Sequence, residues 1–364
     1  MPSSHVEYSD DTRLVPNPLV SVVMITYNHE RYLAEAIEGV VRQVTDFPIE
    51  LLIGEDCSTD GTREIALSYQ ILFPEMIRVI TSERNVGMHK NGERLIAAAR
   101  GKYIAFCEGD DYWSIPDKLG LQISILESDS NISLVCTSWR TISEDGIPIN
   151  TDTLSLERGR GHYFGLDDII VSGKIRTLTV CSRTVLVREA MSESPLCKRG
   201  RYPMGDHPLW VALSRYGVCY CIPDVSASYR VSPESTTRPR DPMNAYKFLA
   251  GLGEFERDVL DLYELSQGEE ATTLFKISAT RRRLRALALL GDSVAAQHEL
   301  EKLEMYKSRI KTADRLMYVL SSLVHPGTMG ALTLKWGIHM WRAVRYGIWP
   351  NGKRLTLPWA EPRH

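Results

Sequence analysis

Apolar stretches of strand length alternate with stretches of helical periodicity over the first hundred residues of the chain. Four runs rich in apolar and β-branched residues have the length and composition of buried strands, at 19–27, 49–56, 76–81 and 102–108. Apolar residues recur at helical spacing between these runs, in 33–44, 59–73 and 90–100. This order predicts an α/β fold with a mostly parallel sheet, right-handed crossovers and flanking helices.

Polar residues lie at the carboxyl end of each of the four predicted strands. Thr26, Tyr27 and Asn28 end the first, Glu55 and Asp56 end the second, Asn85, Gly87 and Lys90 follow the third, and Glu108, Asp110 and Asp111 end the fourth. Sheets of this kind bind ligands at the carboxyl ends of their strands. The four groups are therefore predicted to meet at one edge of the sheet.

The stretch AFCEGDDYW places three carboxylates, Glu108, Asp110 and Asp111, around one glycine at the end of the fourth strand. Clustered carboxylates repel one another unless a cation lies among them. Their oxygens suit Mg²⁺ or Mn²⁺, with diphosphate oxygens and water completing the coordination shell. Asp111 taken alone is also explained as a cap of the segment that follows, and for that residue both interpretations stay open.

Composition and charge narrow the class of protein. The chain has 364 residues, of which 43% are hydrophobic and 24% charged, as in ordinary globular proteins. Its net charge of -3 gives no bulk electrostatic case for a nucleic-acid partner. The seven cysteines show no zinc-ligand spacing, and Cys219 and Cys221 are predicted to be core thiols of one strand face. The N-terminus shows no signal-peptide pattern, which favours a reducing, cytoplasmic setting.

Four segments, from Val20 to about Arg230, resemble the glycosyltransferases of family two, a large inverting family of GT-A fold that uses nucleotide sugars. In chain order they read VSVVMITYNHERYLAEAI, GEDCSTDGT, NVGMHKNGERLIAAARGKYIAFCEGDDYW and YPMGDHPLWVAL. The resemblance implies the fold of a nucleotide-diphospho-sugar transferase with a mostly parallel sheet, followed here by a C-terminal helical appendage. It also implies transfer from a UDP- or dTDP-sugar donor.

The resemblance assigns a role to each strand-end residue. Thr26 and Tyr27 would line the base pocket, Glu30 would lie near the ribose, and Lys90 near the base or the diphosphate. Asp56 matches the acid that accepts the N3–H of a uracil or thymine ring. Glu108, Gly109 and Asp110 match the DxD motif, with Glu in place of the commoner Asp at the first position. Asp110, with Asp111, would hold the Mn²⁺ or Mg²⁺ ion.

The same resemblance makes Asp206 the general base that takes the proton of the acceptor hydroxyl. On spacing alone, Asp206 is also typical of a helix N-cap before Pro208. Arg176, between the two acidic segments, would contact an acceptor phosphate or sugar, with a solvated arginine as the alternative. Relatives often carry a metal-binding histidine after a Tyr-Arg pair. Here Ser232 stands in that region, so another residue must complete the metal shell.

The pattern divides the chain into an N-terminal extension at 1–18, a catalytic domain at 19–240, a helical region at 241–310 and a tail at 311–364. The catalytic domain is expected to have a nucleotide-sugar half at about 19–113 and an acceptor half at about 114–240. The tail contains eight Lys or Arg against two acidic residues, with four tryptophans interleaved. These features are typical of a segment lying in a membrane interface, and a helix pair packed on the catalytic domain is the alternative.

The sequence therefore predicts a metal-dependent inverting glycosyltransferase, peripheral on the inner face of the cell membrane. Its acceptor would be a glycan or a polyprenyl-linked sugar in surface polysaccharide biosynthesis. Two other classes are compatible with a nucleotide site on such a sheet. A sugar-phosphate nucleotidyltransferase normally needs a glycine-rich loop after the first strand, which TYNHERY lacks. A non-catalytic nucleotide-sugar-binding protein would bind nucleotide without turnover.

Overall fold

The computed structural model describes residues 5–152, 161–172, 175–198, 201–231, 242–263 and 292–305, with several positions between 273 and 287. The chain consists of two compact units, Met1–Ser232 and Pro233–His364. The predicted boundary at residues 240 and 241 and the whole tail at 311–364 lie outside the described residues. In the second unit, helices α8 (Pro242–Leu262) and α10 (Ser293–Met305) occupy parts of the segment predicted to be helical.

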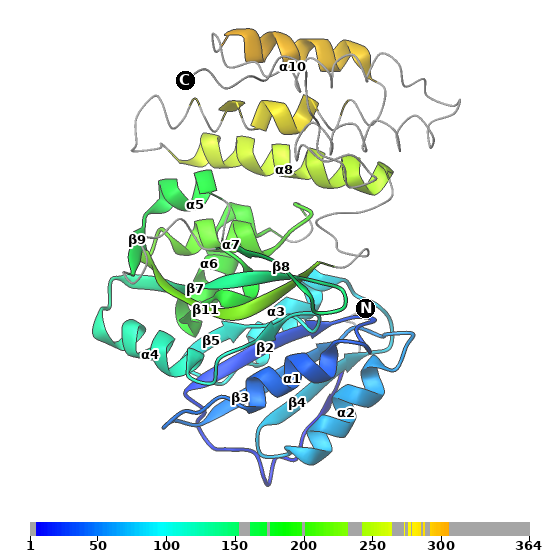
Figure 1. Ribbon diagram of the computed structural model, residues 1–364, viewed down its shortest axis with the longest axis vertical. Helices are drawn as coiled ribbons and strands as arrows, with labels where there is room; N and C mark the ends of the chain where they lie inside the picture. Colours follow the sequence, from blue (N-terminus) through cyan, green and yellow to red (C-terminus); the bar gives the residue numbers. More distant parts are fainter. Residues whose placement is uncertain are drawn as a thin grey trace. The chain divides into compact units, whose positions relative to one another are not determined.

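The first unit begins with the predicted alternation of strands and helices (Figure 1). The strands are β2 (Val20–Thr26), β3 (Ile49–Glu55), β4 (Ile77–Ser82) and β5 (Tyr103–Phe106), and the helices between them are α1 (Leu33–Val41), α2 (Thr62–Leu72) and α3 (Met88–Ala98). Each overlaps the segment that the apolar pattern predicted, so the prediction of an α/β fold is confirmed.

The order of the strands creates a switch point beside β2. The four strands lie parallel in the order β4-β3-β2-β5, so the chain builds outward from β2 on one side and then crosses to its other side. Loops that leave β2 and β5 diverge at such a point and leave room for a ligand at the carboxyl edge. Thr26 is the last residue of β2, and Glu108 lies two residues beyond the end of β5. Two of the predicted binding segments are therefore neighbours at the switch point.

The second half of the sheet is mixed. Strand β10 (Cys181–Arg183) is antiparallel to both β5 and β7 (Ile132–Ser143), and β7 is parallel to β11 (Val218–Val231). The short strands β6 (Tyr112–Trp113), β8 (Pro148–Asp152) and β9 (His162–Phe164) pair at its margins. The remaining helical elements are α4 (Lys118–Ser128), α5 (Leu166–Ser172), α6 (Thr184–Glu193) and α7 (Asp206–Leu213), with the short η1 (Thr177–Thr179) and η2 (Pro195–Cys197).

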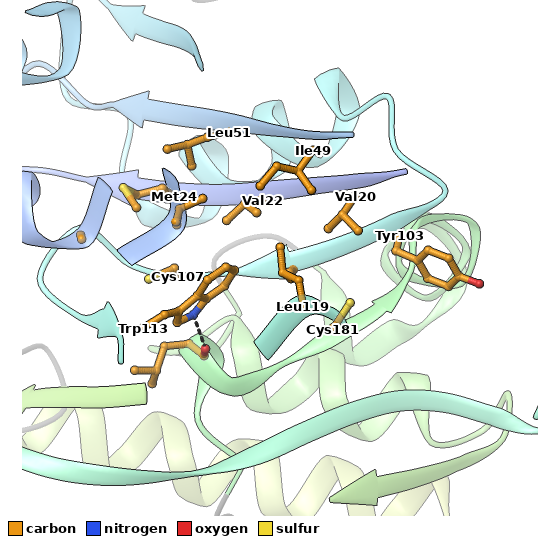
Figure 2. Packing of buried hydrophobic residues seen from close by; sticks show 14 of the residues in the cluster. Val20, Val22, Met24, Ile49, Leu51, Tyr103, Cys107, Trp113, Leu119 and Cys181 are labelled. Atoms are coloured by element: carbon orange, nitrogen blue, oxygen red, sulfur yellow. Dashed lines mark hydrogen bonds between the residues drawn. The ribbon is translucent and has the colours of Figure 1, made fainter. Parts of the chain in front are cut away.

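The core lies along β2, β3 and β5, whose side chains are buried on both faces (Figure 2). Trp113 packs among them, and its indole Nε1 donates a hydrogen bond of 2.8 Å to the carbonyl oxygen of Leu178. This bond ties the segment after β5 to η1. The predicted core thiols Cys219 and Cys221 are fully buried on β11, as expected.

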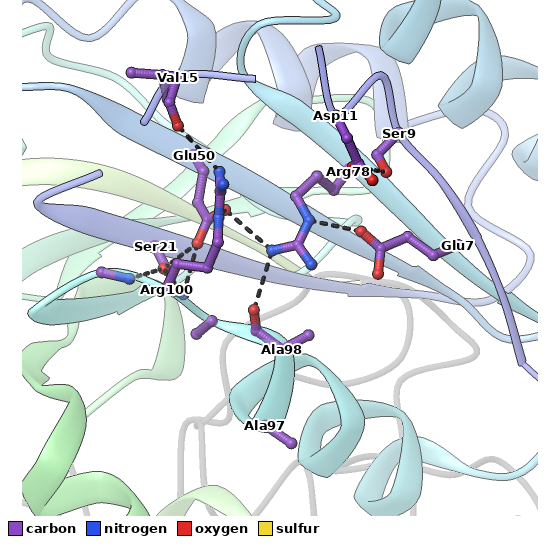
Figure 3. Close-up of polar contacts among 12 residues, drawn as sticks. Glu7, Ser9, Asp11, Val15, Ser21, Glu50, Arg78, Ala97, Ala98 and Arg100 are labelled. Atoms are coloured by element: carbon purple, nitrogen blue, oxygen red, sulfur yellow. Dashed lines mark hydrogen bonds and ion pairs between the residues drawn. The ribbon is translucent and has the colours of Figure 1, made fainter. Parts of the chain in front are cut away.

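A buried ion network closes the amino-terminal edge of the parallel strands, opposite the predicted binding edge (Figure 3). Glu50, with no exposed surface, accepts a hydrogen bond of 2.6 Å from Ser21 Oγ and pairs with Arg78 and Arg100 at 3.1 and 2.8 Å. Arg78 also pairs with Glu7 of β1 (His5–Tyr8) at 2.7 Å. Burial raises the pKa of Glu50, but hydrogen bonds from Ser21 and Arg100 outweigh it and leave that pKa below its usual value.

Within the described residues, no helix has both the length and the apolar character needed to cross a bilayer.

Candidate active site

The loops that leave β2 and β3 are joined by hydrogen bonds. Asn28 Oδ1 accepts from the Thr59 amide at 2.8 Å, and the His29 amide donates to Thr62 Oγ1 at 2.7 Å. Glu30 Oε2 accepts from the Gly61 amide at 2.6 Å. The exposed Glu30, predicted to lie near a ribose, is therefore held against the loop between β3 and α2.

Asn28 and Cys57 each follow a strand with positive φ, 56° and 60°. Non-glycine residues rarely adopt this backbone region, and they do so mostly where the surrounding structure enforces it. Both positions lie immediately beyond predicted ligand-binding residues, Tyr27 and Asp56. Tyr27 itself is 41% exposed, so its ring is available to a ligand.

Asp56 organises the loop that precedes α3. Its Oδ1 accepts from Ser82 Oγ at 3.2 Å and from the Val86 amide at 2.8 Å, and its Oδ2 accepts from the Gly87 amide at 2.8 Å. The side chain is almost fully buried. A carboxylate offers about four acceptor positions, so about one position on Oδ2 is left. Lys90, on the first turns of α3, is exposed.

Gly109 follows β5 and lies close to the end of β2, where its amide donates to the Ile25 carbonyl oxygen at 3.0 Å. A β-carbon at this position would stand 2.7 Å from Thr26 Oγ1 and 3.1 Å from His29 Nδ1, so a larger residue would force the strand ends apart. Thr26 Oγ1 and His29 Nδ1 are both buried without a hydrogen-bond partner among the described residues. Buried polar atoms are rarely left unpaired, so these two are available to a bound ligand or an ordered water.

Glu108 and Asp110, which flank this glycine, come close to the carboxylate of Asp206 from a distant segment. Burial and the charges of Asp110 and Asp206 raise the pKa of Glu108 to about 8. The Asp206 carboxylate is held in place, because Oδ2 accepts from Thr177 Oγ1 at 2.9 Å and Oδ1 accepts from the His207 amide at 2.8 Å. The predicted base and the predicted DxD-like motif therefore meet at one site.

Asp111 and Arg230 hold the acidic loop, residues 107–111, in place by hydrogen bonds. Asp111 is 3% exposed and its Oδ1 accepts the Arg230 amide at 2.7 Å. Burial and the charges of Asp110 and Glu108 raise the pKa of Asp111 well above its usual value. The Arg230 guanidinium donates to the carbonyl oxygens of Asp110 and Glu144, each at 2.9 Å, and pairs with Glu35 at 2.5 Å.

Arg230, Thr177 and His29 are site residues that the sequence pattern did not indicate. Arg230 belongs to the Tyr-Arg pair that a metal-binding histidine often follows in relatives, and Ser232, which stands in that region here, lies outside the described residues. Thr177 lies in a segment without apolar periodicity, and its contact with Asp206 spans 29 positions. His29 lies in the first of the four segments that resemble the family, VSVVMITYNHERYLAEAI. Its closeness to Gly109 depends on the pairing of β2 with β5, which the sequence does not show.

The residues present fit a divalent cation. Among the described residues, the Asp110 carboxylate has no hydrogen bond or ion pair, and Glu108 Oε2 is buried without a partner. Two oxygen donors that repel each other are a favourable start for a hard cation. No group of three or more His, Cys, Asp or Glu residues that could hold a metal occurs in the part of the chain that the structure describes.

The family model of "Glycosyl transferase family 2" matches residues 21–188. Over this segment, slightly less than half of the chain, the resemblance stated from the sequence is confirmed. A mannosyltransferase from Pyrobaculum calidifontis, solved with GDP-Man and Mn²⁺, has the fold of this chain at a TM-score of 0.54 and 15% identity, covering 85% of this chain and 88% of that one.

Curated relatives match about a third of the chain. An uncharacterized protein of Mycobacterium tuberculosis is 42% identical over 127 residues, 35% of this chain and 37% of that protein. The putative teichuronic acid biosynthesis glycosyltransferase TuaG of Bacillus subtilis is 33% identical over 36% of this chain and 51% of its own. The UDP-Glc:alpha-D-GlcNAc-diphosphoundecaprenol beta-1,3-glucosyltransferase WfgD of Escherichia coli is 33% identical over 35% of this chain and 49% of its own. The chain thus matches about half or less of the length of these relatives.

Proposed function

We propose that the chain is a metal-dependent, inverting glycosyltransferase. It would move a sugar from a UDP- or dTDP-sugar to a glycan or polyprenyl-linked acceptor in surface polysaccharide biosynthesis. The observation that carries the proposal is the convergence of Glu108, Asp110 and Asp206 beside Gly109 at the switch point of the sheet. The names of the relatives TuaG and WfgD support the class of reaction.

The donor would bind along the ends of β2, β3 and β5. The remaining acceptor position of Asp56 would take the N3–H of a uracil or thymine ring, which cytosine lacks. The exposed Tyr27 ring and the Thr26 hydroxyl would line the base pocket. Glu30 would lie at the ribose and Lys90 near the base or the diphosphate. His29 Nδ1 adds an unpaired polar atom beside Gly109 for the same ligand.

Asp110 would hold Mn²⁺ or Mg²⁺, with Glu108 beside it on a metal-bound water or a ribose hydroxyl. Asp111, the second predicted ligand, has only Oδ2 left for the ion, because its Oδ1 accepts the Arg230 amide. The bound ion would stabilise the negative charge that grows on the leaving diphosphate. Arg230 holds the carbonyl of Asp110 and so fixes the loop that presents this carboxylate.

Asp206 would remove the proton of the acceptor hydroxyl as that oxygen attacks the anomeric carbon. The hydrogen bonds from Thr177 and from the His207 amide fix the orientation of the carboxylate. Attack from the face opposite the leaving diphosphate inverts the anomeric centre in a single displacement. Asp206 is the first residue of α7, so it lies on a rigid element.

The experiment is a screen of UDP- and dTDP-sugars with Mn²⁺ for donor binding and for release of nucleoside diphosphate. Asp206→Asn should lower turnover by at least about two orders of magnitude, the scale of a lost general base, and leave donor affinity unchanged. Glu64→Gln, a change of an exposed carboxylate on α2, is the matched control and should leave both values unaltered. Nucleotide-sugar binding with no turnover for any acceptor would favour the non-catalytic binding protein instead.

A further inference from the structure

Arg176 carries a positive charge that no described residue neutralises. Among the described residues, its side chain has no carboxylate within ion-pair distance, and its Nε is buried without a hydrogen bond. The guanidinium carbon lies 4.7 Å from the centre of the Tyr229 ring and 5.7 Å from that of Trp139. These rings come from the neighbouring strands β11 and β7 and hold the guanidinium by cation–π contacts.

The backbone fixes this arginine next to the candidate base. The carbonyl oxygen of Arg176 accepts from the amide of Thr179 at 2.9 Å and from its Oγ1 at 2.6 Å. The next residue, Thr177, donates its hydroxyl to Asp206 Oδ2 at 2.9 Å. Arg176 and Asp206 are therefore linked through one residue and share the acceptor side of the site.

The negative charge of the site indicates which kind of ligand Arg176 would bind. Asp206, Glu108 and Asp110 would repel a negatively charged acceptor as it approached Asp206. A half-buried guanidinium without a counter-ion is costly unless a ligand supplies one. Its planar group of donors matches the geometry of phosphate and carboxylate oxygens.

We propose that Arg176 binds an anionic group of the acceptor, so that the acceptor carries a phosphate or a carboxylate close to its attacking hydroxyl. This inference rests on the proposed function, because it takes Asp206 to face the acceptor. The phosphate would come from a lipid diphosphate and the carboxylate from an acidic sugar. Both present oxygens of the same charge to the guanidinium.

The test measures binding to the full chain loaded with Mn²⁺ and UDP, by calorimetry, and needs no knowledge of the natural donor. Three soluble probes are compared, namely glucosyl hexyl diphosphate, hexyl glucuronide and the neutral hexyl glucoside. At least one charged probe should bind about tenfold more tightly than the neutral one, the effect of a hydrogen bond to a charged group. The probe that does so distinguishes a diphosphate from an acidic sugar.

Arg176→Gln should reduce this preference to less than about threefold, and Arg176→Lys should retain part of it. Arg42→Gln, which removes an arginine whose side chain is 74% exposed, should retain all of it. Equal binding of charged and neutral probes by the unmodified protein, or a preference that survives Arg176→Gln, overturns the inference. So does a loss of UDP affinity in Arg176→Gln, because the arginine would then serve the donor. Failure of Mn²⁺ and UDP to bind the unmodified protein would count against the proposed function instead.

Discussion

At the scale of single residues, Asp110 differs from the neighbouring acidic residues in the hydrogen bonding of its side chain. Its neighbours Glu108 and Asp111 are held by burial or by hydrogen bonds, whereas the Asp110 carboxylate has no partner among the described residues. Its main chain, by contrast, is anchored through the carbonyl to Arg230. A free carboxylate on a fixed backbone is well suited to take an ion at a defined place.

Asp110→Asn should therefore abolish Mn²⁺ binding without unfolding the protein, because a neutral amide is a poor ligand for a hard cation. Electron paramagnetic resonance of Mn²⁺ in the presence of UDP measures the affinity directly, and circular dichroism checks the fold. Glu64→Gln serves again as control. Mn²⁺ affinity equal to that of the unmodified protein would remove Asp110 from the metal site, as would full transferase activity in EDTA.

At the scale of elements, Arg230 joins four segments that are distant in the sequence. From β11 it contacts the loop after β5, the turn between β7 and β8, Glu35 of α1 and the ring of Tyr32, which directly precedes α1. The side chain is 4% exposed, so these bonds are shielded from water. The acidic loop is thus supported from the acceptor half of the sheet.

Arg230→Met should lower the free energy of unfolding by at least about 2 kcal/mol, because it leaves buried carbonyl oxygens without donors. It should also weaken Mn²⁺ binding. The control is Arg31→Met, since Arg31 pairs with Glu144 of the same turn but is 56% exposed, and exposed pairs contribute little. Urea denaturation and Mn²⁺ titration measure both effects. Equal losses of stability and of Mn²⁺ affinity in the two variants would mean that the buried contacts of Arg230 contribute no more than the exposed pair of Arg31.

The network around Glu50 makes a second prediction at this scale. Because the pKa of Glu50 is lower in the folded than in the unfolded chain, its ionised form stabilises the protein above the unfolded pKa of about 4.3. That contribution is lost as the pH falls through the folded pKa. Glu50→Gln should destabilise the protein at pH 7 by about 3 kcal/mol, since it breaks buried ion pairs.

Urea denaturation at pH 7 and near pH 4 tests this, and the difference between the two proteins should shrink at the lower pH. Substrate and Mn²⁺ binding should stay unchanged in the variant, because the network lies at the edge opposite the site. A difference that does not vary with pH would show that packing, and not the charge, accounts for the effect.

At the scale of the whole molecule, the basic and aromatic tail at 311–364 is the remaining prediction, and it lies outside the described residues. If the tail lies in a membrane interface, each basic residue near anionic lipid contributes about 1 kcal/mol. Deletion after Lys311 should release the protein from anionic vesicles in a flotation assay. UDP binding should persist, because the described site residues all precede residue 232. Loss of UDP binding or aggregation of the truncated protein would favour the packed helix pair.

The sequence was most informative where structure is local. The strands β2 to β5 are continuous apolar runs, and parallel strands bring their carboxyl ends to one edge, so the donor-side residues could be placed together from pattern alone. The supports of the site could not be, since Arg230 lies 195 positions from its partner Glu35. Strand β1 could not be predicted either, because it has only four residues, HVEY, and all four are exposed. It was assigned to an extension and is part of the sheet.

That short strand has a consequence for how the protein is handled. β1 pairs antiparallel with β4, from His5 opposite Ser82 to Tyr8 opposite Val79, and Glu7 neutralises Arg78 beneath it. A version trimmed to the predicted first strand at residue 19 would leave the backbone amides and carbonyls of β4 open along one side. Open strand edges of apolar sequence pair with other chains. Strand β1 therefore shields the edge of β4 from pairing with other chains, and a protein trimmed of it would be expected to precipitate although its described site residues all remain.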